Sequence, residues 1–313
     1  RGLGDVYKRQ VDITSSQRPG EVGNINIRGQ RSINAEQGPL YVVDGMVIQN
    51  GGIENINPSD IEAIDILKDA SATAIYGSRG ANGVILVTTK KGKEGKVTLN
   101  YSGTVTFETL HDVTEMMSAA EWLDYARLAK YNAGSYASAT PTYEADKAAF
   151  GSVTASWKNI EKAWVNGVYD PSLVGSYDWA SHGKQTGITH EHTLSASGGS
   201  DKFQGYASFG YLDQKGTQPG QAYERYTLKT SFDVTPVNWF KMGSSINASY
   251  STQDYGYSFS KSVTGSGDFY SALRSMIPWT VPYDENGEYV RYPSGDVNII
   301  NPIRELDYLS LIH

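Results

Sequence analysis

The hydrophobic pattern of the chain changes near residue 96. From there on, apolar and polar side chains alternate, as they do in a β-strand with one apolar face. In the first of these alternating runs, the residues on one face are Val97, Leu99, Tyr101, Gly103, Val105 and Phe107. The alternation returns over residues 193–197, 203–211, 225–234 and 240–250. We therefore predict five strands, several of about ten residues or more, which is long enough to cross a bilayer at a tilt.

The connections between these strands alternate in length. Residues 198–202 and 235–238 are short turns, whereas residues 110–187, 214–224 and 253 onward are long loops. Short turns at one end and long loops at the other are typical of outer-membrane β-barrels. Aromatic residues near the strand ends would suit the girdles of such a barrel: Phe107, Phe203, Tyr211, Tyr226, Trp239, Phe240 and Tyr250. A soluble β-sandwich also has alternating strands and stays open as an alternative.

Residues 11–95 follow a different pattern, that of a small α/β unit. Short strands rich in Ile, Val and Leu are predicted over residues 24–28, 40–44, 63–67 and 83–89, with a helical turn over 59–62. The stretch GSRGANG at 77–83 has three glycines, as phosphate-binding loops do. Its order is reversed, however, because we predict a helix over 70–76, capped by Asp69 and ended by Gly77, before the strand. A phosphate would meet the carbonyl end of that helix, so we predict no nucleotide site.

The composition excludes several classes of function. The formal net charge is −7 and 19% of residues are charged, so the chain has no basic field to hold nucleic acid. It contains no cysteine, and therefore no disulfide or thiolate site. Neither G-x-S-x-G nor H-E-x-x-H occurs, and we assign His190 and His192, which share one strand face, to a polar lumen rather than to a metal. We predict no enzymatic activity, no cofactor and no metal.

Two further expectations concern the loops and the ends of the chain. A helix is predicted over residues 119–132, ended by Gly134, and a hairpin over 283–289. The first ten residues, RGLGDVYKRQ, and residues 309–313, LSLIH, resemble translated sequencing adaptors, and we expect both to be non-native. On this expectation the α/β unit covers residues 11–95, and the strand region with its long loops covers 96–308.

Three stretches carry a resemblance to a known family. The segments IRGQRSINAEQGPLYVVDG and NPSDIEAIDILKDASATAIYGSRGANGVILVTTKKGKEGKVTLNYSG resemble the plug and first strand of SusC/RagA-type TonB-dependent outer-membrane transporters. DWASHGKQTGITHEHTLSASGGSDKFQGYASFGYLDQKG is similar to that family's second and third strands. The resemblance implies an α+β plug domain followed by about five of the about 22 antiparallel strands of a transmembrane β-barrel.

The resemblance also implies a function, a location and partners. The expected function is TonB-dependent import of a bulky nutrient, an oligosaccharide or a peptide, across the outer membrane of a Gram-negative cell, with the plug gating the lumen. The implied partners are TonB, through an N-terminal segment not found in these residues, a SusD-like surface lipoprotein and outer-membrane lipid. Two alternatives stay open: a TonB-dependent receptor for a metal chelate or vitamin, and a soluble carbohydrate-binding β protein.

The candidate residues fall into two sets. Positions that match the family's plug signature, and are therefore fold and gating candidates, are Arg28, Gly29, Tyr41, Asp44, Gly45, Asp60, Glu62, Lys68, Asp69, Tyr76, Gly77, Arg79, Asn82 and Gly83. We expect Arg28, Arg31 and Arg79 either to pair with lumen carboxylates such as Glu108 or Asp233, or to hold the plug's own loops. Loop aromatics that offer flat faces to a sugar, or else pack within the loops, are Trp157, Trp164, Tyr169, Tyr177, Trp179, Tyr255 and Tyr257.

Overall fold

The computed structural model describes residues 11–13, 18–21, 23, 25–27, 38–48, 53–67, 74–111, 116–257 and 269–310. The chain divides into two compact units. One combines residues 1–108, 187–216 and 221–255, and the other combines residues 109–186, 217–220 and 256–313. We call the first the plug–wall unit and the second the loop unit.

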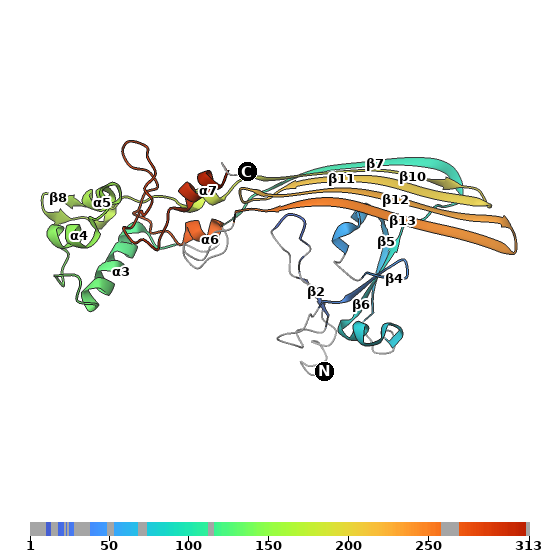
Figure 1. Cartoon of the computed structure of the whole chain (residues 1–313), viewed down its shortest axis with the longest axis horizontal. Helices are drawn as coiled ribbons and strands as arrows, with labels where there is room; N and C mark the ends of the chain where they lie inside the picture. The colour runs from blue at the N-terminus through green and yellow to red at the C-terminus, as the bar shows by residue number, and fades with distance from the viewer. Residues whose placement is uncertain are drawn as a thin grey trace. The chain divides into compact units, whose positions relative to one another are not determined.

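The wall of the plug–wall unit is one antiparallel sheet (Figure 1). Its five strands, in the spatial order β13-β12-β11-β10-β7, are β7 (Gly95–Glu108), β10 (Gly187–Gly199), β11 (Phe203–Lys215), β12 (Gln221–Val237) and β13 (Phe240–Tyr255). The five predicted strands are thus confirmed, and each runs further than its alternating core. The turn predicted over 235–238 is shorter than expected, because β12 continues to Val237 after a register irregularity beyond Val234. Pro236 lies in that irregularity, where the lack of an amide donor breaks no ladder hydrogen bond.

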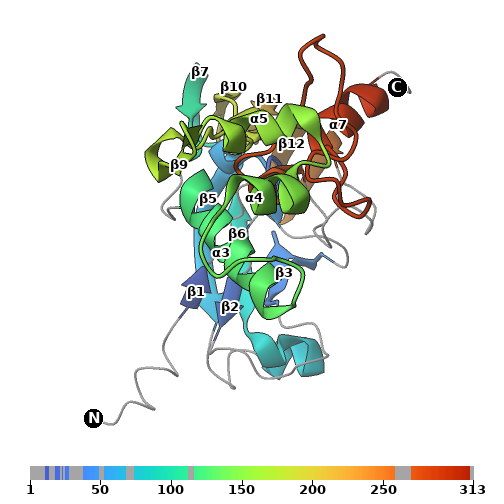
Figure 2. The ribbon, with the colours of Figure 1, turned by 90° about the vertical axis from the view of Figure 1, so that its left-hand side faces the viewer.

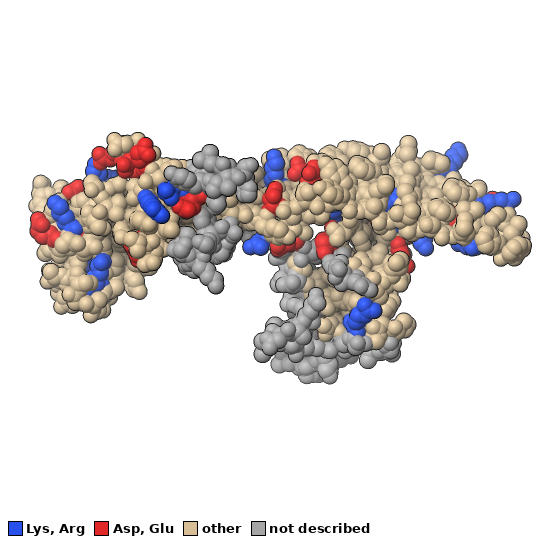
Figure 3. Space-filling model, viewed as in Figure 1, with Lys and Arg blue, Asp and Glu red and all other residues tan. Residues whose placement is uncertain are grey.

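The two faces of the wall differ in chemistry. The strand register aligns a row of side chains across the sheet: Tyr101, Leu194, Phe209, Leu228 and Ala248. Leu194, Phe209 and Leu228 in this row are 53%, 50% and 49% exposed. On the opposite face Thr193, Ser208 and Lys229 are buried. The central part of the strands is largely free of charged side chains on the face drawn in Figure 3. Because a sandwich would bury the apolar face against a second sheet, this single layer does not fit the sandwich alternative.

Exposed aromatic residues mark both ends of the apolar face. Phe240 and Tyr250 on β13 are 44% and 67% exposed. At a rise of about 3.3 Å per residue and a tilt of about 40°, the strand between them spans roughly 25 Å along the barrel axis. That is the height of the apolar band of an outer-membrane barrel.

The plug lies against the polar face of the wall (Figure 1). Its sheet has the order β4-β3-β6-β5, and its elements are β1 (Val11–Ile13), β2 (Ile25–Ile27), β3 (Leu40–Val43), β4 (Met46–Val47), β5 (Ile61–Leu67), β6 (Val84–Thr89) and the 3-10 helices η1 (Ile53–Asn55), η2 (Pro58–Asp60) and η3 (Ala74–Asn82). Strands β3 and β6 are parallel, and β1 and β2 pair separately (Figure 2). Ile27, Ile85 and Val87 form the small apolar core that these short strands enclose.

The glycine stretch of the plug agrees with its prediction in part. Asp69 and residues 70–73 lie outside the described residues. The first helical segment ends at Gly77, as predicted, because Gly77 has a non-helical conformation with a φ of 60°; a second segment follows it, so that η3 runs to Asn82 across this kink. The order of helix before strand holds, because β6 begins at Val84.

The loop unit is mainly helical. Its elements are α3 (Ala119–Asn132), α4 (Tyr143–Phe150), α5 (Thr154–Glu161), β8 (Trp164–Val165), β9 (Val168–Tyr169), η4 (Pro171–Leu173), η5 (Ala180–Gly183), α6 (Phe269–Arg274) and α7 (Pro302–Ser310). The predicted helix over 119–132 is confirmed; Ser118 and Glu121 cap it reciprocally, and Gly134 follows it with a φ of 70°. Tyr283 and Tyr289 form the bridge of the predicted hairpin. None of the described helices is both long and apolar enough to pass through a membrane.

A buried ionic cluster joins the helices of the loop unit. The carboxylate of Asp146, on α4, is fully buried and accepts hydrogen bonds from Arg127 (2.9 Å), Tyr136 (2.7 Å) and Trp164 (3.0 Å). Burial alone would lower the pKa of Arg127, but its pairing with Asp146 outweighs this and raises it. Burial and the same carboxylate raise the pKa of the Tyr136 hydroxyl to about 12. Arg127 also pairs with the exposed carboxylate of Asp124 at 2.8 Å, so the cluster holds two ion pairs, which share Arg127, and a neutral phenol at ordinary pH.

Candidate plug–wall gating site

A tight turn places one carboxylate of the plug against the wall. Asp44 and Gly45 connect β3 to β4 and have φ values of 49° and 85°, as the Asp-Gly pair of a type I′ hairpin requires. The Asp44 carboxylate accepts a hydrogen bond from the Thr89 amide at 2.9 Å and another from the Thr89 hydroxyl. Asp44 therefore ties the β3–β4 turn to the last residue of β6.

A lysine of the wall lies next to this carboxylate. Lys229, at an inward position of β12, is 2% exposed. Its ammonium group donates to the Thr89 hydroxyl and lies 3.8 Å from Asp44 Oδ2. The three side chains form a buried polar contact between plug and wall, in which an ion pair offsets part of the cost of removing both charges from water.

A second contact lies at the 3-10 helix η2. Asn57 caps this helix by accepting the Ser59 amide at 2.9 Å, and its side-chain amide donates to Thr193 of β10 at 3.0 Å. Asp60, at the end of the same helix, is buried and accepts the hydroxyl of Tyr206 of β11 at 2.7 Å. One short helical turn thus presents two polar side chains to two neighbouring strands.

Glycines in the wall allow this close approach. A Cβ atom on Gly210 of β11 would lie 2.2 Å from the side-chain nitrogen of Asn57. A Cβ atom on Gly92, in the segment that joins the plug to the wall, would lie 2.3 Å from the backbone nitrogen of Gly205. Real Cβ atoms do not approach so closely, so any side chain at Gly210 would displace the Asn57 contact.

The arginine pairs that we expected are not what the structure shows. Arg28, Gly29, Arg31, Lys68 and Asp69 lie outside the described residues. Arg79 is exposed and has no carboxylate within salt-bridge distance among the described residues. Its proposed partner Asp233 instead lies 4.0 Å from Lys241 of the wall. The charges are reversed relative to the expectation: where the structure describes an ion pair between plug and wall, the plug supplies the acid and the wall the base.

The remaining signature residues lie away from this contact. Tyr41 is half-buried, and burial, followed by the nearby Glu54, raises the pKa of its hydroxyl. Glu62 pairs with Lys93 at 3.0 Å on the plug surface. Tyr76 and Asn82 are partly buried in η3, and Gly83, with a φ of 97°, packs on Ile27.

Two of the loop aromatics are core residues. Trp157 and Trp179 are only 5% and 3% exposed and belong to hydrophobic clusters, so neither offers a face to a sugar. Trp164 donates to Asp146, and Tyr169 lies under the Arg127 guanidinium, 4.1 Å from its centre.

The other three aromatics vary in exposure. Tyr177 and Tyr257 are partly buried against the cluster that contains Trp179. Tyr255 is 63% exposed at the end of β13.

The prediction that His190 and His192 face the lumen was wrong. His190 and His192 share the face of Leu194, which is the outward, apolar one, because the intervening Thr193 points to Asn57 of the plug. The Tyr101 hydroxyl lies 2.8 Å from His192 Nδ1, and the two rings are stacked. These histidines therefore belong to an outward aromatic row. No cluster of three or more metal-ligating side chains occurs in the part of the chain that the structure describes.

Sequence reasoning missed the residues that make the contacts, Asn57, Tyr206 and Lys229. Lys229 had one visible signal: it is a charged residue at the centre of a strand, and its two neighbours on the same face, Thr227 and Ser231, are small hydroxyl residues. A long cation at such a position needs a partner across the lumen.

The chain is similar in sequence and in fold to several known proteins. Residues 1–84 match the model of the TonB-dependent receptor plug domain. TonB-dependent receptor P39 of Formosa agariphila is 33% identical over 283 residues, which are 90% of this chain and 24% of that protein. TonB-dependent receptor SusC of Bacteroides thetaiotaomicron is 29% identical over 300 residues, 93% of this chain and 26% of that protein. The RagAB peptide importer in its open-open state superimposes with a TM-score of 0.70 and 28% identity, over 94% of this chain and 33% of that one.

A plug domain docked on the polar face of long antiparallel strands defines the class of TonB-dependent receptors. Within that class, the chain belongs to the SusC/RagA-type family and contains its plug and the first strands of its barrel wall. It spans about a quarter of the length of the curated relatives that it matches.

Proposed function

We propose that the protein acts in TonB-dependent import of a bulky nutrient across the outer membrane of a Gram-negative cell. The plug closes the lumen, and TonB, pulling on an N-terminal segment, rearranges it. The cargo is an oligosaccharide or a peptide, and a SusD-like lipoprotein at the cell surface helps to capture it. The relatives support this reading: one of the similar structures is a peptide importer, and the curated relatives are TonB-dependent receptors. No covalent change of the cargo is involved.

The observation that carries the proposal is the polar character of the plug–wall contact. Lys229, Asp44 and Thr89 form one contact, and Tyr206 and Asp60 form another. A buried polar contact is specific in geometry but adds little net stability, because desolvation cancels most of its attraction. A plug held in this way has one defined resting position and can be released by breaking a few contacts in turn. An apolar interface of the same size would resist such release more strongly.

A reversible cross-link tests whether the plug must move. The chain contains no cysteine, so an introduced pair has no competing thiol within these residues. Asn57→Cys with Thr193→Cys joins plug to wall at side chains that are now 3.0 Å apart. In the full-length receptor, expressed in cells that take up a fluorescent oligosaccharide or peptide in a TonB-dependent manner, we expect oxidation to abolish uptake and a reductant to restore it.

The matched control joins two wall strands to each other. Ser195→Cys with Ser208→Cys links directly opposed inward positions of β10 and β11, within the wall alone. We expect this disulfide to leave uptake unchanged. Equal uptake with the plug–wall disulfide closed would contradict the proposed movement.

A further inference from the structure

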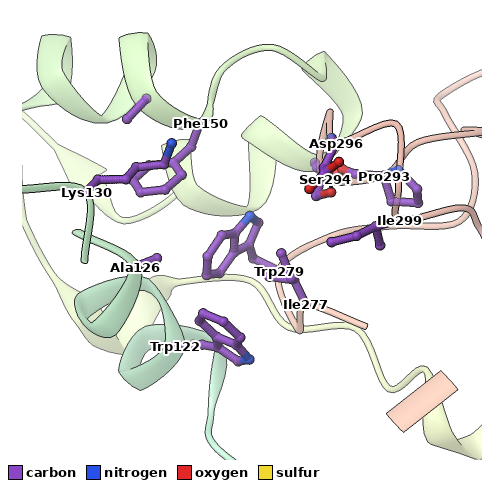
Figure 4. Close-up of a pocket in the computed structure, with 12 residues that line it drawn as sticks. Trp122, Ala126, Lys130, Phe150, Ile277, Trp279, Pro293, Ser294, Asp296 and Ile299 are labelled. Carbon is purple, nitrogen blue, oxygen red and sulfur yellow. Dashed lines mark hydrogen bonds between the residues drawn. The ribbon is translucent and has the colours of Figure 1, made fainter. Parts of the chain in front are cut away.

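The loop unit contains a cavity that is lined by none of the aromatic residues predicted to contact a sugar. It lies between helix α3, the end of α4 and the segment 277–299, and has a volume of about 190 Å³ (Figure 4). Its apolar walls are formed mainly by Trp122, Phe150, Ile277 and Ile299, which are partly buried; Trp279, only 5% exposed, supports these side chains and offers little surface of its own. Trp122 and Phe150 meet Trp279 edge to face, with ring centroids 6.1 and 5.7 Å apart. The edge-to-face packing fixes the orientation of the three rings.

Polar groups lie on two sides of these aromatic walls. Lys130 and Phe150 lie on one side of Trp279, and Ser294 and Asp296 lie on the other (Figure 4). The Lys130 ammonium is 5.5 Å from the centre of the Phe150 ring and makes no hydrogen bond to the described residues. Asp296 uses one carboxylate oxygen to hold the amide of Asn298 at 2.9 Å, and the other oxygen accepts nothing from the residues that the structure describes. The cavity therefore offers one free cationic donor and one free anionic acceptor.

We propose that this cavity binds one sugar ring of a neutral glycan. A pyranose has an apolar C–H face, which suits the aromatic walls, and a rim of hydroxyl groups. Each hydroxyl both donates and accepts, so the ring satisfies Lys130 at one end and Asp296 at the other without bringing a charge of its own. The apolar side chain of a peptide fills the same walls but itself carries no group that pairs with Lys130 or Asp296.

The size of the cavity limits the ligand to a single ring. A volume of about 190 Å³ holds roughly six water molecules, well below the 300 Å³ or more of pockets that enclose a drug-sized ligand. The site therefore contacts one unit of a longer chain, and affinity for an isolated ring is low. The inference rests on the proposed import function and, of the two cargo classes named there, selects the glycan.

Saturation-transfer difference NMR on the full-length receptor tests the site. The protein is kept in a detergent without a sugar headgroup, and the probes are the methyl pyranosides of glucose, galactose, mannose and xylose. N-acetyl amides of leucine and phenylalanine are run alongside as peptide probes. We expect saturation transfer to at least one pyranoside and to neither amide.

Two variants separate the site from the fold. Asp296→Asn keeps the shape of an exposed loop residue and removes the acceptor charge, and we expect it to weaken binding of the responsive pyranoside roughly three- to tenfold. Asp170→Asn is the matched control, because Asp170 is also exposed and holds the amide two residues ahead, that of Ser172, at 2.9 Å. We expect the control to bind as the wild type does.

Each outcome decides the inference. No response from any pyranoside, a response from an amide instead, or equal binding by the two variants would overturn the sugar site. The proposed import function is judged separately, by TonB-dependent uptake: a receptor that imports cargo but binds no pyranoside here retains that function and loses this site. A receptor that binds the pyranoside but shows no TonB-dependent uptake retains the site and loses the function.

Discussion

Replacing Lys229 by methionine should loosen the plug without disturbing the wall. Methionine keeps an unbranched apolar chain of similar length in the buried site but removes the ammonium group. The Asp44 carboxylate, whose side chain is 16% exposed, then remains without its counter-charge. Removing one member of a buried ion pair costs about 3–5 kcal/mol. Because Thr89 still donates twice to Asp44 and some water reaches it, we expect a cost near the lower limit, about 3 kcal/mol.

Hydrogen exchange of the plug amides in the full-length receptor measures this cost. A destabilisation of about 3 kcal/mol raises the exchange rate of β6 amides roughly a hundredfold when they exchange through opening of the plug. Lys241→Met is the matched control: Lys241 also lies on a wall strand, 4.0 Å from Asp233, but its side chain is 68% exposed, so its loss costs at most about 1 kcal/mol.

A second substitution separates the lost attraction from the uncompensated charge. Asn fits the positive φ of the Asp44 turn, so Asp44→Asn keeps the hairpin. In the double variant with Lys229→Met neither charge remains, and we expect the exchange rate to return most of the way to that of the wild type. The reasoning is refuted if Lys229→Met exchanges within about threefold of the Lys241→Met control.

Three further changes test other parts of the structure. Tyr206→Phe removes the hydroxyl that Asp60 accepts at 2.7 Å and should raise plug exchange roughly tenfold or more, measured in the same way. Tyr136 holds its proton more tightly in the folded loop unit, where its pKa is about 12, than in the unfolded chain, where it is about 10. Its contribution to stability is therefore complete below pH 10 and lost as pH rises toward 12. Tyr136→Phe should flatten that part of the alkaline unfolding curve, with unfolding measured by limited proteolysis. Leu228→Arg puts a charge on the apolar face and should cost about 2–4 kcal/mol, seen as less heat-resistant folded barrel on a gel.

Each of these has an outcome that would count against it. Unchanged exchange in Tyr206→Phe would mean that Asp60 finds another donor. An alkaline transition of the same slope in Tyr136→Phe would assign the titration to other tyrosines. Normal assembly of Leu228→Arg would contradict the assignment of this face to lipid. Its control is Trp239→Arg, because Trp239 is 86% exposed at a strand end and a charge near the interface costs at most about 1 kcal/mol.

The strands were predictable because their signal is local. An alternating apolar face is visible within a few residues, so β7 was predicted almost to its ends. Strand β10 was found only over its last part, because two of the three outward positions before Leu194 are His190 and His192, which are not apolar. The same reasoning explains why those histidines were placed on the wrong face: their polarity suggested the lumen, whereas the strand period places them with Leu194.

The plug–wall contacts were not predictable in the same way. Lys229 and Thr89 lie 140 positions apart in sequence, and no local pattern specifies which inward residue meets which plug residue. The loop tryptophans, in contrast, carried a signal that was overlooked. Trp157 and Ile160 are three residues apart, the spacing of one helical face, and both are buried in α5.

In strand β12, the contact with lipid on one face and the contact with the plug on the other favour the same pairing register. Leu228 is 49% exposed on the apolar face, and the next residue, Lys229, is 2% exposed on the other. A slip of one residue would exchange these environments along the whole strand, placing a lysine in lipid and a leucine against Asp44. The lipid face alone penalises this slip by a few kcal/mol at Lys229, and loss of the ion pair adds a cost of similar size. The plug contact is therefore a second constraint on the strand pairing, and it acts at Lys229, the residue that pairs with Asp44 of the plug.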